Sequence, residues 1–111
     1  MKDFYDLWLL ANQFTFDGAL LAKAITATFA NRGTAIDVAP IAFTAEFTEQ
    51  APTLAQWTAF RKRLASTQMP DRLADVVVVL STFLLPVALA CSTGASFEQQ
   101  WAPGGPWNPI V

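Results

Sequence analysis

The first six residues hold a lysine and two aspartates whose types and spacing could serve phosphate chemistry. Lys2, Asp3 and Asp6 lie at the start of an expected helix, and a step of three residues places both carboxylates on one face, a turn apart. Two carboxylates beside a lysine suit Mg²⁺-assisted phosphoryl transfer, because the metal and the ammonium neutralise charge on phosphate oxygens. Aspartates also stabilise the first turn of a helix through its dipole, and the spacing alone favours this second interpretation.

A second candidate is the run of basic residues Arg61, Lys62 and Arg63, which could contact the phosphates of a nucleic acid. Consecutive residues of a helix point about 100° apart, so the three side chains are not expected to form one tight cluster. A solvated helix face is the competing interpretation. The single cysteine, Cys91, lies in an apolar run with no base nearby and is expected to be an unreactive core residue.

The composition excludes several classes of site. The chain has 111 residues, no histidine and one cysteine, which excludes an internal disulfide, a cysteine-based zinc site and imidazole chemistry within it. Hydrophobic residues make up 53% and charged residues 14%, so a disordered polar tail is excluded as well. The net charge of −2 gives no general attraction to nucleic acid but still permits a local basic patch.

Apolar residues recur at steps of three and four along most of the chain, which predicts a single all-α domain over residues 1–111. We expect a compact bundle of about five helices followed by an irregular tail rich in proline, glycine and tryptophan. The expected caps are Asp17, Thr44 and Thr53 at helix starts, with Gly33 and Gly94 at helix ends. The expected helices cover residues 2–13, 18–32, a short turn after Thr44, 54–66, a long segment from Pro70 to Cys91, and a last short helix at 96–101.

The long apolar segment contains sixteen residues without a charge, 76–91. It is shorter than the about 20 apolar residues that a membrane-spanning helix needs, so we expect a buried core helix. Its four consecutive valines favour a strand locally, but the length of the run favours a helix. Pro86 should either kink this helix or begin a second one.

The same residues resemble one family over nearly the whole chain. The opening, KDFYDLWLLANQFTFDGALLAKAITATFANRGT, is similar to AbiEii/AbiGii-type nucleotidyltransferase toxins of type IV toxin–antitoxin systems. The resemblance continues through Pro40, WTAFRKRL at 57–64, FLLP at 83–86 and WAPGGPW at 101–107. It implies the helical C-terminal portion of a DNA polymerase β-like nucleotidyltransferase. Lys2 would then face nucleotide phosphates, while Asp3 and Asp6 would help to organise the site.

The sequence also departs from that family's pattern. It contains neither the GS turn nor the D-x-D metal pair of the catalytic core. We therefore expect a truncated, cytoplasmic toxin fragment that is inactive alone, with no metal site or cofactor of its own. The resemblance implies Mg²⁺, an NTP and an RNA acceptor such as tRNA only for the complete enzyme.

A non-catalytic helical module is the alternative. Such a module would pair with an antitoxin or a separate catalytic half, without membrane contact. Loss of the core should expose the apolar face of the first helix and favour self-association through Phe4, Leu7, Trp8 and Leu9.

Overall fold

A computed structural model describes residues 1–33, 35–36, 40, 43–64 and 69–109. These residues form five helices and a small three-stranded sheet, so the helical prediction is confirmed but the all-α prediction is wrong. In chain order the elements are α1 (Lys2–Gln13), β1 (Phe16–Asp17), α2 (Gly18–Arg32), α3 (Ala45–Thr48), α4 (Ala51–Leu64), α5 (Leu73–Thr93), β2 (Gln99–Trp101) and β3 (Trp107–Pro109).

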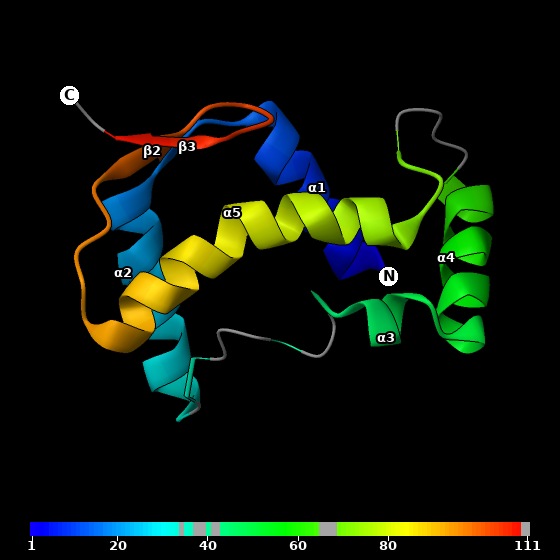
Figure 1. Cartoon of the computed structure of the whole chain (residues 1–111), viewed down its shortest axis with the longest axis horizontal. Coiled ribbons are helices and arrows are strands. Elements are labelled where there is room, and N and C mark those ends of the chain that lie inside the picture. The colour runs from blue at the N-terminus through cyan, green and yellow to red at the C-terminus, as the bar shows by residue number, and fades with distance from the viewer. Residues whose placement is uncertain (34, 37–39, 41–42, 65–68, 110–111) are drawn as a thin grey trace.

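Helix α5 is the axis of the fold and runs across most of the molecule (Figure 1). Helices α1 and α2 pack against it, the sheet lies beside its middle and C-terminal half, and α3 and α4 lie towards its N-terminal end. Its buried residues recur at helical spacing on the covered faces. They are Leu73, Val76, Val77, Leu80, Phe83, Val87, Ala88 and Ala90.

The predicted ends of α2 are confirmed. The Asp17 carboxylate accepts hydrogen bonds from the backbone N–H groups of Ala19 and Leu20, at 2.9 and 3.2 Å. Gly33 ends the helix at φ 63°, a left-handed conformation that glycine adopts without steric cost. The connection predicted at residues 34–40 lies largely outside the described residues.

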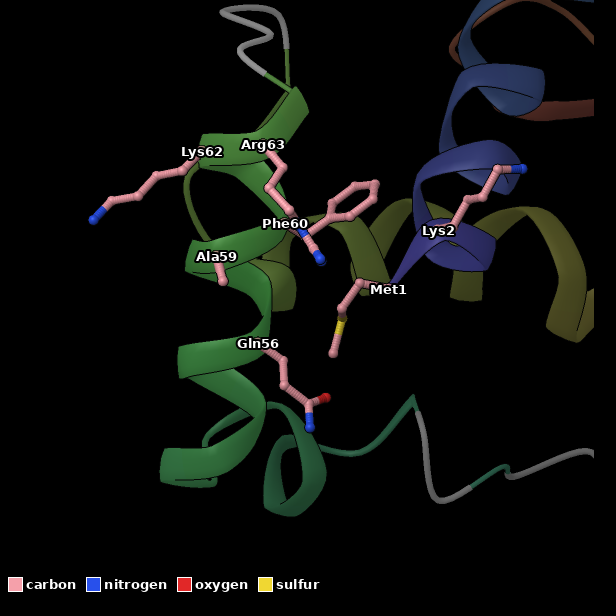
Figure 2. Close-up of a pocket in the computed structure, with 7 residues that line it drawn as sticks. All are labelled: Met1, Lys2, Gln56, Ala59, Phe60, Lys62 and Arg63. Atoms are coloured by element: carbon pink, nitrogen blue, oxygen red, sulfur yellow. The ribbon is translucent and has the colours of Figure 1, made fainter.

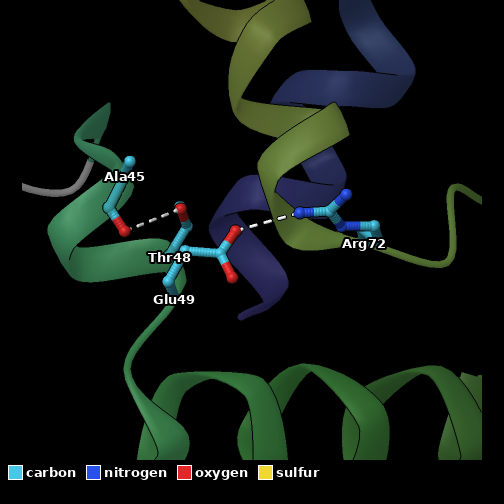
Figure 3. Close-up of polar contacts among 4 residues, drawn as sticks. All are labelled: Ala45, Thr48, Glu49 and Arg72. Atoms are coloured by element: carbon cyan, nitrogen blue, oxygen red, sulfur yellow. Dashed lines mark hydrogen bonds and ion pairs between the residues drawn. The ribbon is translucent and has the colours of Figure 1, made fainter.

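Short helix α3 begins as predicted, but α4 does not. The Thr44 hydroxyl accepts a hydrogen bond from the N–H of Phe47 at 3.3 Å. Helix α4 starts at Ala51, so Thr53 is not its cap but a buried residue of its first turn. A hydrogen-bonded ion pair of 3.0 Å between Glu49 and Arg72 joins the end of α3 to the residue before α5 (Figure 3).

The apolar face predicted for α4 is only partly covered. The spacing of its apolar residues predicts one face made of Leu54, Trp57, Phe60 and Leu64. Trp57 is buried and Phe60 is half-buried, whereas Leu54 and Leu64 are exposed. Helix α4 packs along a narrow stripe because only one side of it meets the rest of the fold.

Helix α5 is one continuous helix with Pro86 inside it, starting at Leu73 rather than near Pro70 and ending at Gly94 as predicted. Proline has no N–H for the carbonyl of Thr82, and both residues are exposed, so water can supply the missing donor. By length and composition α5 is the one described helix that could cross a membrane, and 44% of its most apolar window is buried within the protein.

The tail folds into a β-hairpin, which corrects the helix predicted at 96–101 and the irregular tail. Strand β2 pairs antiparallel with both β1 and β3, and Trp101 lies opposite Trp107. The indole N–H of Trp101 donates to the carbonyl of Ala11 at 2.7 Å, and that of Trp107 donates to the carbonyl of Phe83 at 2.8 Å. The two tryptophans therefore fix the tail to α1 and α5.

Candidate functional site

Lys2 and Asp6 contact each other on the exposed surface of α1. The Lys2 ammonium lies 2.7 Å from the Asp6 carboxylate, one helical turn away, and the two side chains are 80% and 43% exposed. The hydrogen bond to Asp6 raises the pKa of Lys2 most, and the charge of Asp6 adds to the rise; desolvation opposes it, and the charge of Asp3 adds the smallest contribution. Asp3 is exposed. The three predicted residues thus form a solvent-facing charged group.

These carboxylates do not make a Mg²⁺ site by themselves. Asp6 is already engaged by the Lys2 ammonium. Within the described ranges, no three or more aspartate, glutamate, histidine or cysteine side chains gather where they could hold a metal ion. Mg²⁺ requires near-octahedral oxygen coordination, with protein carboxylates and substrate phosphates together supplying ligands. The donor set at the start of α1 is too small for that role alone.

The start of α1 lies beside α4 across an open hollow of about 690 Å³, which we call the α1–α4 hollow. Three of its lining residues are basic and none is acidic. The lining residues are Met1, Lys2, Gln56, Ala59, Phe60, Lys62 and Arg63. The hollow is therefore bordered by residues from both predicted sets, which lie far apart in the sequence. Lys2 comes from the predicted catalytic set, and Lys62 and Arg63 come from the predicted nucleic-acid-binding set.

The three basic residues are differently oriented (Figure 2). The Arg63 side chain points into the space between α4 and Met1, whereas the Lys2 ammonium points away from α4. Lys62 extends outward from the opposite side of α4, so only the base of its side chain borders the hollow. Arg63 is thus the cation best placed to meet an anion there.

Arg61 takes a different direction from its neighbours. Its guanidinium forms an ion pair with Asp71, and only 28% of its side chain is exposed. It does not line the hollow. The basic run is therefore divided between an ion pair and the hollow, and the expectation that it does not form one cluster is confirmed.

Gln56 and Phe60 belong to this surface, although the sequence analysis did not assign them to it. Gln56, Phe60 and Arg63 lie four and three residues apart, which places them on one face of α4. Phe60 is held by Trp57, with ring centroids 5.8 Å apart, and by an edge contact with Tyr5, also at 5.8 Å. The spacing was visible in the sequence, but nothing in it indicated that this face meets the start of α1.

Cys91 is half-buried, and its thiol donates to the carbonyl of Ala22 at 3.4 Å. This contact joins α5 to α2. The predicted core position is only partly confirmed, because Cys91 also borders a hollow between α2 and the residues after α5, and its lack of reactivity stays a prediction.

The fold and the site together define a small, mainly helical protein with a lysine–aspartate pair beside a basic hollow. A family model described as "Nucleotidyl transferase AbiEii toxin, Type IV TA system" matches residues 1–80, from α1 into α5. The chain belongs to this family, which confirms the resemblance seen in the sequence. Searches of curated proteins and of solved structures found no significant match.

Proposed function

We propose that this chain is the helical portion of an AbiEii-type nucleotidyl transferase toxin and acts together with a catalytic core that it does not itself contain. In the complete enzyme, nucleotides would pass from an NTP to RNA, with tRNA the expected acceptor, in the cytoplasm. Lys2 would face the nucleotide phosphates. Asp6 and Asp3 would orient the lysine, while Mg²⁺ ligands would come from the core.

One observation carries this proposal. The matched region begins with the helix that holds Lys2 and Asp6 in contact, and that pair is exposed at the edge of a basic hollow. An exposed lysine whose charge is stabilised by a carboxylate remains cationic at neutral pH. Such a group can approach a phosphate that the catalytic core holds. The two carboxylates alone, a turn apart on one helix, cannot position a triphosphate for in-line attack.

A non-catalytic interaction module is the second candidate, and the family's toxin–antitoxin context supports an antitoxin as its partner. The expected self-association face of α1 is in part covered, because Phe4, Leu7 and Trp8 pack against the core. The apolar residues left exposed on α5 are Val78 and Leu89, at 64% and 55%. In this alternative, the exposed side of α5 would meet the partner.

The test is a reconstituted transfer reaction. The purified chain is incubated with labelled NTPs, Mg²⁺ and bulk tRNA, alone and with the GS…D-x-D core of an AbiEii-family enzyme truncated before its own Lys–Asp helix. We expect no incorporation by the chain alone and incorporation by the mixture. Lys2→Gln should reduce the mixture's rate by about 100-fold, as expected when a group that stabilises transition-state charge is lost.

Lys23→Gln is the matched control, because it removes an equally exposed lysine from α2, away from the α1–α4 hollow. Its rate should equal that of the unchanged chain. Incorporation by the chain alone would refute the requirement for a core. A mixture whose rate does not respond to Lys2→Gln would refute the catalytic role and leave the interaction module.

A further inference from the structure

The α1–α4 hollow has a charge opposite to that of the chain as a whole. The net charge is −2, yet the residues lining the hollow include three cations and no carboxylate. Asp6 neutralises Lys2, and Asp71 pairs with Arg61 outside the hollow. Arg63 belongs to no ion pair among the described residues, and its side chain points into the hollow. Its unpaired charge therefore attracts an anion there.

The shape and chemistry of the lining narrow the class of that anion. Arg63 presents a planar guanidinium that can bind a phosphate through two parallel hydrogen bonds. Phe60 and Met1 form an apolar wall beside it, and the Gln56 amide points into the same space (Figure 2). A guanidinium, an aromatic wall and an amide on one helix face are the groups that bind single-stranded RNA, by phosphate, base face and base edge respectively.

The rigidity of the wall supports the same class of ligand. Trp57 is buried, and with Tyr5 it fixes the Phe60 ring from two sides. From Gln56 to Arg63, helix α4 rises about 10 Å, which is enough for one nucleotide and its phosphate. The volume of about 690 Å³ is within the range of small-ligand sites, and the hollow opens widely to solvent, as a polymer that continues beyond it requires.

We propose that the α1–α4 hollow binds one nucleotide of a single-stranded RNA, with Arg63 on its phosphate and Phe60 and Gln56 against its base. This inference rests on the proposed function, because it assigns the RNA acceptor to this hollow. It places the acceptor between α4 and the start of α1, on the side of α1 opposite to the direction in which the Lys2 ammonium points.

The experiment measures RNA binding without NTP or catalytic core. A fluorescently labelled 12-nucleotide single-stranded RNA of mixed sequence is titrated with the chain, and anisotropy is followed from 50 to 200 mM salt. Arg63→Gln should weaken binding by about tenfold at 100 mM salt. The slope of log affinity against log salt should fall in magnitude by about 0.7, because one lost phosphate contact removes about that much for a single strand.

Lys23→Gln is the charge-matched control, since it lowers the net charge by one unit, as Arg63→Gln does. It should leave affinity within about twofold of the unchanged chain. Arg63→Lys keeps the charge but loses the paired hydrogen bonds, and it should weaken binding by about threefold. Circular dichroism of each variant verifies that the helices are retained.

Three results would overturn the inference. One is an equal loss of affinity in Lys23→Gln and Arg63→Gln, which would show a diffuse charge effect. Another is equal competition by polyglutamate, which would assign the hollow to an acidic protein. The third is RNA binding unchanged in Arg63→Gln. The binding experiment does not measure nucleotide transfer, so the two proposals can fail separately. RNA binding at the hollow without transfer in the reconstituted reaction would refute the proposed function alone. Transfer in the reconstituted reaction without RNA binding at the hollow would refute this inference alone.

Discussion

The N-terminal end of α5, near α4, and its middle, beside the hairpin, are held by different kinds of contact. On the hairpin side, Phe83 at the centre of α5 lies between aromatic rings, including those of Trp101 and Trp107 at 4.8 and 5.9 Å. Both indole N–H groups there donate to backbone carbonyls. At the α4 end, Trp57 is equally buried, but its indole N–H has no acceptor among the described residues. The ion pairs at that end lie on the surface.

This difference separates the stable part of the molecule from the part proposed to bind ligand. On the hairpin side, both indole N–H groups have acceptors and the aromatic rings pack against one another, so this part of the core is well packed. Exposed ion pairs contribute little, about 0–1 kcal/mol each, so α4 depends mainly on Trp57 and Phe60 for its position. Binding surfaces are commonly drawn from the less stable part of a fold. The basic hollow lies on that part.

The largest expected effect compares the two buried tryptophans. Trp101→Phe removes the hydrogen bond to Ala11 together with some packing, and it should lower the free energy of unfolding by about 2–4 kcal/mol. Trp57→Phe removes a donor that has no acceptor in the described part of the chain, and it should cost only about 1–2 kcal/mol. Urea unfolding followed by circular dichroism measures both. Equal losses would show that the Trp57 indole has a partner outside the described residues.

A smaller effect concerns the contact between α2 and the residues around β2. A Cβ at Gly18 would lie 2.5 Å from the Phe97 ring and 2.7 Å from the backbone oxygen of Gln99. Gly18→Ala should therefore cost about 1–3 kcal/mol through overpacking. Gly33→Ala is the control: its Cβ would meet open space, and only the left-handed φ of 63° opposes it, at about 1 kcal/mol. A cost for Gly18→Ala below that for Gly33→Ala, in thermal unfolding, would contradict this close packing.

The smallest expected effect is the pH response of the exposed Lys2–Asp6 pair. Asp6 raises the pKa of folded Lys2 above its ordinary value of 10.5. The stabilisation is therefore fully present below the unfolded pKa and is lost as pH rises through the folded pKa. NMR titration of the Lys2 side chain from pH 9 to 12 measures the shift. Asp6→Asn should remove most of it and high salt should reduce it, whereas Asp3→Asn should remove little. A pKa unaffected by Asp6→Asn would mean that the pair does not form in solution.

Local chemistry made several features predictable. The cap of Asp17 and the ends at Gly33 and Gly94 depend on hydrogen bonds and backbone conformations within a few residues. The hydroxyl of Thr53 can accept a hydrogen bond at a helix start, so its residue type predicts a cap. Burial against the core places it inside α4 instead.

The candidate site was predictable only in its parts. The types and spacing of Lys2, Asp3 and Asp6 indicated phosphate chemistry, and the pairing of Lys2 with Asp6 follows from their spacing of four. The separation of Arg61 from Lys62 and Arg63 depended on Asp71, ten residues further along the chain from Arg61. Gln56 and Phe60 joined the site only because α4 lies beside the start of α1.

By itself, the sequence determined the positions of the main helices, the family and the charged groups available for chemistry, because periodicity, caps and motifs are properties of neighbouring residues. The tertiary structure alone decided that residues 99–101 and 107–109 form strands and that Lys2 shares a hollow with Arg63. Strand pairing and the meeting of distant helices depend on contacts between residues far apart in the chain, and their free energy appears only when the whole core is assembled.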